Sequence, residues 1–415
     1  MSTKQSTTAD STPTIPTWVE ASLFESTLKD MIPSFKQIKE FKANKALGAG
    51  ENYNTVVLHL DIAVELNDGS SKSVSLILKT AHDNEMFRMM MQFNNVFEIE
   101  TTMYKEVVPE LEQLYKEAGL DVTFGAKFYE LSTNNPYILL EDLRVKGFKN
   151  ENRVEGLDMD HTKAVLKKLA QWHAASAVRV AVKGPYKPLV SNGAFKEEMR
   201  DMMKAMFASM YPIFMEVSKK YEGDEEYFEA MCNMQANIIE EMTKGMKVDA
   251  NEFNVLNHGD CWSNNVMFQH DAFGKIKETY LIDFQMPKYG SPAQDLYYFL
   301  LSSAKYEIKI KQFDYFIKYY HEQLVEHLKM LNYSKKIPAL RDIHMMLYKY
   351  GLWGYTTANT TMAGALLDPT ELAGTENFVS NTDAGMQFKI QLLSNPRYRQ
   401  HMKLVLPWLY NRGAF

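Results

Sequence analysis

Two stretches of sequence decide the fold of this chain: Asn257-His258-Gly259-Asp260-Cys261-Trp262-Ser263-Asn264-Asn265-Val266-Met267-Phe268 and Tyr280-Leu281-Ile282-Asp283-Phe284-Gln285. Apolar runs predict short antiparallel strands at Val266 to Gln269 and Thr279 to Asp283. The segment from His270 to Lys275 is expected to be the turn between them. The two stretches therefore predict a hairpin with polar residues at its open end.

Three polar side chains are expected to converge at that end. If the hairpin is centred on Gly274, Asn265 lies opposite Asp283. Asp260 stands five residues before Asn265, in a loop that can curl back over the same point. Carboxylate and amide oxygens suit a hard divalent cation, and the remaining carboxylate can meet a hydroxyl. Phosphoryl transfer needs this combination of a metal-bound phosphate and an orienting carboxylate.

Composition limits the class of protein. The chain has 415 residues, a net charge of −6 and 46% hydrophobic residues, which is typical of a soluble protein large enough for two or three domains. No global excess of Lys and Arg is present, so we expect no nucleic-acid partner. No apolar run approaches the roughly 18 residues of a membrane span. The two cysteines, Cys232 and Cys261, favour a reducing compartment, so we expect a cytoplasmic protein. We also expect it to be a monomer.

The period of hydrophobic residues changes along the chain. Alternating apolar positions from Val56 to Leu66 predict a strand with one buried face, and Val74 to Thr80 predict its partner. Asn67-Asp68-Gly69-Ser70 between them is typical of a hairpin turn. Helical periods are expected at Thr17 to Met31, at Glu85 to Tyr115, and over most of the chain from Asp160. The pattern predicts a small sheet followed by a larger helical part.

The two quoted stretches resemble the catalytic loop and the metal-binding Asp of kinases. His258-Gly259-Asp260 replaces His-Arg-Asp, Asp283-Phe284-Gln285 replaces Asp-Phe-Gly, and no Ala-Pro-Glu signature follows. Only Phe284 to Gln294 separates Asp283 from Asp295, which is too short for a peptide platform. These departures from protein kinases resemble the aminoglycoside phosphotransferase and choline kinase branch, whose members act on small molecules.

Further segments resemble the ecdysteroid kinase-like family within that branch. They are Gly48-Ala49-Gly50-Glu51-Asn52-Tyr53-Asn54, Phe97-x-x-Glu100-x-x-x-Tyr104, Leu140-Glu141-Asp142-Leu143, Leu169-Ala170-Gln171-Trp172-His173-Ala174-Ala175-Ser176 and Ser291-Pro292-x-x-Asp295-Leu296. The resemblance runs from about Leu47 to Leu300, and the order and spacing of the segments make it specific. It implies an α+β, two-lobed protein kinase-like fold with an N-lobe (16–140), a hinge (141–146) and a C-lobe (147–415). The Ser/Thr-rich residues 1–15 are expected from their composition to form a flexible tail.

The resemblance also implies the catalytic residues and the cofactors, ATP and Mg²⁺. Asp260 orients the acceptor hydroxyl, and Asn265 and Asp283 hold the magnesium ion. Lys79 contacts the nucleotide phosphates and pairs with Glu100. Glu98, two residues earlier, is an alternative partner for Lys79, because the choice of Glu100 depends on its spacing from Tyr104.

The remaining nucleotide-binding positions also follow from the resemblance. Gly48 and Gly50 let the backbone of the first hairpin approach the phosphates, and Asn52 and Ile77 belong to the same site. The backbone from Glu141 to Leu143 holds the adenine. Taken alone, Gly48-x-Gly50 is typical of a simple turn, and Lys79 is typical of a solvated lysine at a strand end.

Four neighbours of the proposed catalytic residues are expected to be structural. His173 lies on an apolar helix face, and His258 is expected to bond to backbone and fix the loop. Asp295 is expected to accept backbone hydrogen bonds from the same loop. Cys261 has no neighbouring base in the sequence, so we interpret it as a loop position and not as a nucleophile.

A row of methionines on one predicted helix is a candidate wall for the pocket that binds the acceptor. The chain has 26 methionines, and Met199, Met202, Met203, Met206 and Met210 fall on one helix face. Core packing is one interpretation, and the wall of an apolar acceptor pocket, to which Tyr297, Tyr298, Trp353 and Tyr355 could contribute, is the other. With the resemblance, the second interpretation favours an ATP-dependent kinase acting on a hydroxyl of an ecdysteroid or another steroid-like or xenobiotic alcohol. The alternatives are a kinase-like protein that binds a hydrophobic ligand, and a choline- or aminoglycoside-type kinase.

Overall fold

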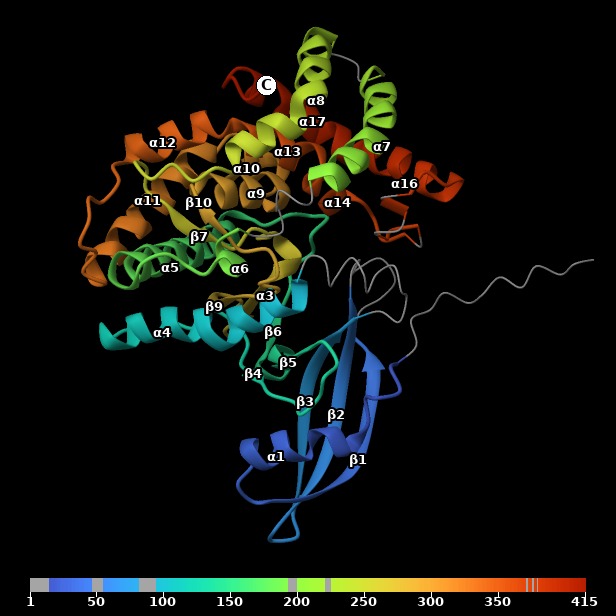
Figure 1. The fold of residues 1–415 in the computed structure, drawn as a ribbon, viewed down its shortest axis with the longest axis vertical. Helices are drawn as coiled ribbons and strands as arrows, with labels where there is room; N and C mark the ends of the chain where they lie inside the picture. The colour runs from blue at the N-terminus through green and yellow to red at the C-terminus, as the bar shows by residue number, and fades with distance from the viewer. Residues whose placement is uncertain are drawn as a thin grey trace, which may run out of the picture. The chain divides into compact units, whose positions relative to one another are not determined.

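The structure is a computed structural model that describes residues 15–46, 55–81, 95–192, 200–220, 225–370, 372–374, 377–378 and 380–415 (Figure 1). It divides into two compact units, each described separately below. The first comprises Met1–Asn95 and Phe128–Asp142, and the second comprises Val96–Lys127 and Leu143–Phe415. The nucleotide-binding positions Gly48, Gly50 and Asn52 lie outside the described residues.

The first unit is a five-stranded antiparallel sheet with two short helices. The strand order is β1-β2-β3-β5-β4. The elements are η1 (Ala21–Phe24), α1 (Glu25–Met31), β1 (Phe35–Lys45), β2 (Val56–Leu66), β3 (Ser71–Thr80), β4 (Phe128–Tyr129) and β5 (Tyr137–Glu141). The expected hairpin of β2 and β3 is confirmed, and Gly69 in its turn has a φ of 82°.

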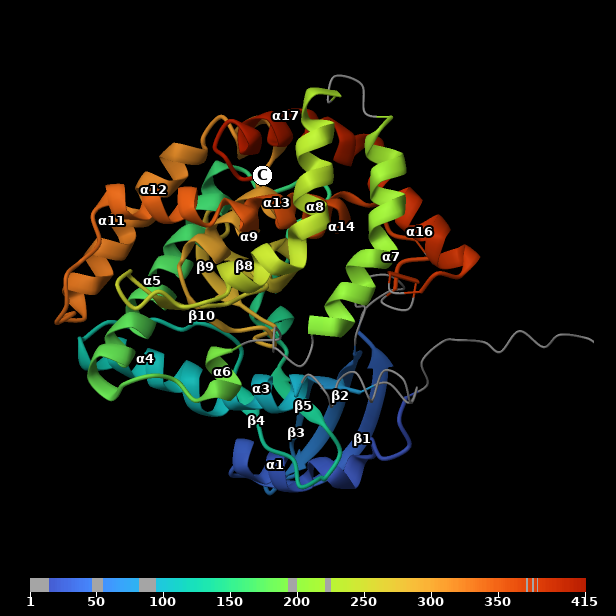
Figure 2. The ribbon, with the colours of Figure 1, turned by 45° about the horizontal axis from the view of Figure 1, so that its top comes forward.

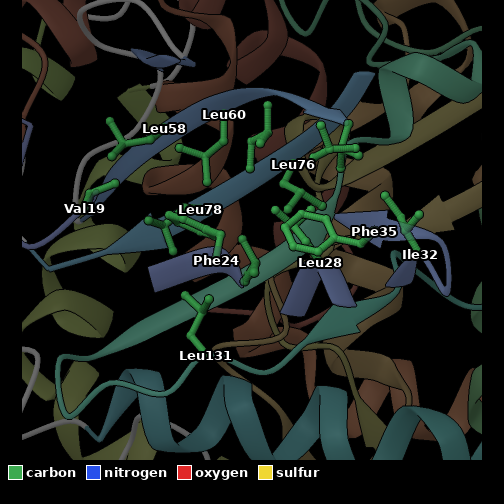
Figure 3. Packing of buried hydrophobic residues seen from close by; sticks show 14 of the residues in the cluster. Val19, Phe24, Leu28, Ile32, Phe35, Leu58, Leu60, Leu76, Leu78 and Leu131 are labelled. Carbon is green, nitrogen blue, oxygen red and sulfur yellow. The ribbon is translucent and has the colours of Figure 1, made fainter. Parts of the chain in front are cut away.

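One face of this sheet forms the core of the first unit. Leu58 pairs with Leu78 and Leu60 with Leu76, so these side chains share a face, and all of them are buried. Figure 3 shows these residues gathered with Phe24 and others of the same hydrophobic cluster. Burying one such side chain contributes about 1.5–3 kcal/mol. Because the even-numbered residues of β2 and β3 face the core, their odd-numbered residues lie on the opposite face of the sheet.

The edge strand β1 was not expected from the sequence. Its apolar residues Phe35, Ile38, Phe41 and Ala43 are spaced by three, three and two positions, unlike a regular strand. Register shifts occur between Phe35 and Gln37 and between Ile38 and Glu40. Each bulge adds a residue to the period of two, which hides the strand in the sequence.

The second unit is mainly helical, with two small sheets of order β6-β8-β9 and β10-β7. The strands are β6 (Phe148–Lys149), β7 (Val255–Asn257), β8 (Val266–His270), β9 (Ile276–Leu281) and β10 (Lys288–Gly290). The helices are α3 (Val96–Thr102), η2 (Met103–Val107), α4 (Val108–Glu117), η3 (Leu143–Lys146), α5 (Met159–Lys183), α6 (Pro188–Ser191), α7 (Arg200–Ser218), α8 (Glu225–Gly245), η5 (Ser263–Asn265), α9 (Ala293–Ser303), α10 (Tyr306–Lys309), α11 (Phe313–Met330), α12 (Leu340–Lys349), α13 (Gly351–Asn359), α14 (Thr361–Leu366), α16 (Asp383–Ser394) and α17 (Pro396–Tyr410). None of the described helices is both long and apolar enough to span a bilayer.

The helices of Val96–Lys127 belong to the second unit because they pack on α5. Figures 1 and 2 both show α4 beside α5. The hydroxyl of Tyr115 donates to the carbonyl of Gln171 at 2.9 Å, and the Phe124 ring meets Trp172 edge to face at 5.1 Å. The fold is α+β, with a small antiparallel sheet and a larger helical part, as expected of a two-lobed kinase-like protein. The functional lobes at 16–140 and 147–415 and the hinge between them stay a prediction.

Candidate active site

The hairpin of β8 and β9 forms as expected, but its register differs by one residue. Val266 pairs with Leu281, and the N–H of Ile282 donates to the carbonyl of Asn265 at 3.0 Å. The expectation that Asn265 lies opposite Asp283 is therefore wrong: its partner is Ile282.

The turn explains the difference in register. The carboxylate of Asp271 accepts the N–H groups of Phe273 and Lys275, both at 2.9 Å, which fixes a tight loop. A register shift beside His270 then leaves Lys277 without a ladder partner. The hairpin is consequently centred between Phe273 and Gly274, half a residue before the expected point.

Asp283 leaves the strand in an unusual backbone conformation. Its φ is 65°, in the left-handed region where Asp and Asn are the most tolerated residues after glycine. Ile282, just before it, is fixed on both sides: its N–H donates to Asn265 and its carbonyl contacts Nε2 of His258 at 3.1 Å. The chain therefore turns sharply after an anchored residue, and this sets the position of the Asp283 side chain.

The carboxylate of Asp260 is held by two side chains. The hydroxyl of Tyr298 donates to Oδ1 at 2.5 Å, and Nδ2 of Asn265 donates to Oδ2 at 2.9 Å. The same Nδ2 also donates to the backbone carbonyl of Asp260 at 2.9 Å. Asn265 is buried, whereas Asp260 is partly exposed. The arrangement joins two of the three predicted polar side chains directly and fixes the carboxylate at the surface of the unit.

Asp295 supports the loop before Asp260, as expected. It is fully buried, and its two oxygens accept the N–H groups of His258 at 2.7 Å and Gly259 at 2.9 Å. Gly259 has a φ of 81°, and a Cβ atom there would lie 1.8 Å from the carbonyl oxygen of Met286. Only glycine fits at this position.

The two histidines of the region have structural partners. Nε2 of His173 lies 3.1 Å from Asp295, and its Nδ1 lies 2.7 Å from the hydroxyl of Tyr320. Nδ1 of His258 accepts the N–H of Asp260 at 3.3 Å. Burial lowers the pKa of His258, so the ring is neutral near pH 7. Both structural interpretations are thus confirmed.

Helix α9 holds the loop of residues 258–263 at three points. The sequence predicted only the contact made by Asp295. Asp295 binds its start, Tyr298 binds Asp260, and the hydroxyl of Ser303 accepts the N–H of Ser263 at 2.9 Å. The roles of Tyr298 and Ser303 were missed. The spacing of Tyr298, one helical turn after Asp295, is the signal that could have revealed its role.

Phe284 anchors the chain immediately after Asp283. It is fully buried, stacks on Trp172 with a centroid separation of 5.2 Å, and meets Tyr104 edge to face at 5.2 Å. Burial raises the pKa of the Tyr104 phenol well above its usual value, and the negative charges of Glu100 and Asp283 add to this effect. Tyr104 therefore lies close enough to both carboxylates to respond to their charges.

Burial distinguishes the two candidate glutamates on α3. Glu100 is 1% exposed, whereas Glu98 is exposed to solvent. A buried carboxylate requires polar or cationic partners, whereas an exposed one does not. Burial therefore favours Glu100 over Glu98 as the predicted partner of Lys79.

Lys79 and Ile77 lie in the first unit, on the face of β3 opposite the hydrophobic core. Lys79 is only 7% exposed, which contradicts the interpretation of a solvated strand-end lysine. In the sheet it pairs with Val57 and Ile138. Ile77 is partly buried two residues before it, and thus on the same face. Glu141 ends β5, and Leu143, 4% exposed, begins η3.

Cys261 does not have the environment of a nucleophile. It is fully buried, and burial together with the charges of Asp295 and Asp260 raises the pKa of its thiol well above the usual value. The thiol form has little nucleophilicity. The interpretation of Cys261 as a loop position is confirmed.

The methionine row is described only in part. Met199 and the side chains of Met202, Met203 and Met206 lie outside what the structure describes, while Met210 on α7 is buried. The acceptor pocket therefore stays a prediction. Tyr297 and Tyr355, two of the aromatic residues considered for it, are each 1% exposed.

Comparisons with known proteins agree with the motifs. A family model described as the ecdysteroid kinase-like family matches residues 49–333, which include every residue of the site in the second unit. No curated protein matches the chain.

Proposed function

The chain belongs to the ecdysteroid kinase-like family, and from this premise we propose that it transfers the γ-phosphoryl group of ATP to a hydroxyl of a lipophilic alcohol. The family is one of small-molecule kinase-like proteins. Our proposed acceptors are ecdysteroids and other steroid-like or xenobiotic alcohols. One observation carries the proposal: the Asp260 carboxylate is fixed by Tyr298 and Asn265 and is still partly exposed.

Asp260 is the residue that meets the acceptor. Its Oδ1 and Oδ2 atoms accept hydrogen bonds from Tyr298 and Asn265, and each oxygen of a carboxylate has two lone pairs. The acceptor hydroxyl donates to one of these oxygens. Asp260 takes its proton as the new oxygen–phosphorus bond forms and the bond between the γ-phosphorus and the leaving ADP oxygen breaks. Burial and the nearby charge of Asp260 raise the pKa of the Tyr298 phenol well above its usual value, so Tyr298 remains a hydrogen-bond donor. Catalysis here relies on positioning and not on a covalent intermediate.

Asn265 and Asp283 are the proposed magnesium ligands, and the donor set fits this ion. Because Nδ2 of Asn265 is used in two hydrogen bonds to Asp260, the amide offers a cation its Oδ1 atom. Asp283 contributes a carboxylate from a backbone conformation that its anchored neighbour maintains. Oxygen ligands of this kind are those that Mg²⁺ prefers. When bound, the ion would neutralise charge on the nucleotide phosphates.

Lys79 is the proposed phosphate ligand of the first unit. Lys79 is only 7% exposed, and a buried lysine needs anionic or polar partners for its ammonium group. Glu100, also buried, is the proposed ion-pair partner of Lys79 in the active protein. The other proposed nucleotide-binding residues are Gly48, Gly50, Asn52, Ile77, Glu141 and Leu143.

The test is ATP turnover in magnesium with a panel of steroid alcohols, choline and an aminoglycoside, with products identified by mass spectrometry. We expect a phosphate monoester of a steroid alcohol, and we expect Asp283→Ala to abolish magnesium-dependent turnover. The matched control is Asp314→Asn, an exposed residue of α11 that pairs with Arg412, and its turnover should equal that of the wild type. Turnover with choline or the aminoglycoside alone would contradict the proposed acceptor. Steroid binding without turnover would contradict the proposed reaction.

A further inference from the structure

A separate cluster of metal-ligand side chains lies in the second unit. Glu151 follows strand β6, His161 stands in the first turn of α5, and His270 ends strand β8. Nε2 of His161 lies 3.1 Å from Nε2 of His270. The Oε1 atom of Glu151 lies 3.6 Å from the first nitrogen and 3.8 Å from the second. Three segments that are distant in sequence thus bring two imidazole nitrogens and a carboxylate oxygen together.

The separations match those around a small transition-metal ion. A point equidistant from three atoms at these separations lies about 2.0 Å from each, the length of a Zn–N or Zn–O bond. Two histidines and a glutamate are also a known zinc ligand set, with water as the fourth ligand. The three side chains are 15–26% exposed.

Neighbouring groups orient the ligands. Nδ1 of His161 lies 2.8 Å from Oδ1 of Asp158, which favours the proton on Nδ1 and directs the Nε2 lone pair towards His270. The Phe268 ring meets the His161 ring edge to face at 4.8 Å. Nδ2 of Asn150 donates to the carbonyls of Asn264 and Val266 at 2.9 and 2.8 Å, which ties the segment before Glu151 to β8. Residues that are not ligands themselves therefore hold the ligand side chains and their segments in place.

The protein alone leaves polar atoms of this cluster incompletely satisfied. Among the described residues, Nδ1 of His270 is buried without a hydrogen-bond partner. Oε1 of Glu151 is buried and makes no well-directed hydrogen bond, although the exposed ammonium group of Lys149 lies 3.2 Å from it. Two imidazole nitrogens facing each other beside a carboxylate are better satisfied by a cation between them than by each other.

We propose that Glu151, His161 and His270 bind a zinc-class divalent ion that links the β8–β9 hairpin to α5. Nitrogen ligands favour this class over magnesium. The ion would brace the far end of the strand that follows Asn265, so it stabilises the unit and takes no part in the transfer step. Lys149 opposes cation binding by its charge and by its contact with Glu151.

The experiment uses the untagged, metal-free full chain, titrated with Zn²⁺ against a chromophoric chelator and with Co²⁺ as an absorption probe. We expect one tight equivalent of zinc and visible Co²⁺ bands. His161→Ala and His270→Gln should each remove this equivalent, and Lys149→Gln should tighten it. Asp158→Asn keeps a cap for α5 but loses the charge on the His161 partner, so zinc affinity should fall about 10- to 100-fold.

Two controls separate this site from the proposed active site. Asp283→Ala should retain the zinc equivalent, and so should His344→Ala, which removes a partly exposed histidine of α12. Zinc should raise the melting temperature of the wild type but not that of His270→Gln. The proposal is overturned if the wild type binds no tight zinc, or if folded His161→Ala and His270→Gln bind it as the wild type does.

Discussion

At the scale of single residues, the site depends on side chains that act through Asp260. Tyr298 and Asn265 hold its carboxylate from two sides, and Asp295 fixes the loop that precedes it. The sequence was sufficient to predict that Asp260 and Asn265 lie together, because their spacing lets the loop curl back. It was not sufficient for Tyr298, because the contact requires knowing that α9 lies against this loop.

Tyr298→Phe tests the positioning role of the Tyr298 hydroxyl. The substitution keeps the ring and removes the hydrogen bond to Asp260, and a hydrogen bond to a charged group contributes about 1.5–3 kcal/mol. We expect kcat to fall about 10- to 100-fold while the KM for ATP stays unchanged. Steady-state kinetics beside Tyr348→Phe, a change at an exposed tyrosine, make the comparison. A fall shared by both variants would contradict the specific role of Tyr298.

Gly259 and Gly274 share a left-handed backbone conformation but differ in the space available for a side chain. Both have positive φ values, 81° and 78°, but a Cβ at Gly259 would collide with Met286, whereas one at Gly274 has nothing within 4 Å. Gly274→Ala should therefore cost about 1–2 kcal/mol, the usual penalty of the left-handed conformation. Gly259→Ala should cost clearly more and abolish turnover. Urea unfolding of both variants measures the difference, and equal losses would contradict the account.

At the scale of elements, helix α9 fixes the candidate active-site loop through Asp295, Tyr298 and Ser303. Alternation was sufficient to predict β2 and β3, which bury one face, and short apolar runs were sufficient to predict β8 and β9. These patterns were insufficient for β1, whose two bulges disrupt the alternation, and for the register of the β8–β9 hairpin, which the Asp271 loop sets. Local patterns predict elements well and predict local distortions poorly.

At the scale of the whole molecule, the net charge of −6 contrasts with the proposed binding of an anionic nucleotide. Lys79 and the proposed magnesium ion would supply positive charge locally. The sequence predicted both structural parts, yet it did not show that Val96–Lys127 packs with the second unit. That assignment depends on contacts such as Tyr115 with Gln171, which connect residues distant in sequence.

A buried lysine predicts part of the pH dependence of stability. Lys309 is fully buried on α10, and burial lowers the pKa of its ammonium group from 10.5 to about 7. Between about pH 7 and pH 10.5 the unfolded chain holds this proton and the folded chain does not, so the unfolding free energy rises with pH over this window.

Lys309→Met removes the titrating ammonium group. The rise of the unfolding free energy between about pH 7 and pH 10.5 should therefore become smaller. Lys311→Met, a change at an exposed lysine two residues later, should leave the rise unchanged. Urea unfolding at several pH values across the window measures the slopes for the two variants and the wild type. Identical slopes for all three proteins would contradict the assignment.

Asp260 is proposed to orient and deprotonate an acceptor hydroxyl, and the proposed reaction depends on this step. The most direct measurement compares kcat for phosphoryl transfer and the Kd of ATP in the wild type and Asp260→Asn. We predict that kcat falls about 10²- to 10⁴-fold, the usual contribution of a positioned general base, while ATP binds equally well. An unchanged kcat in Asp260→Asn would contradict the account.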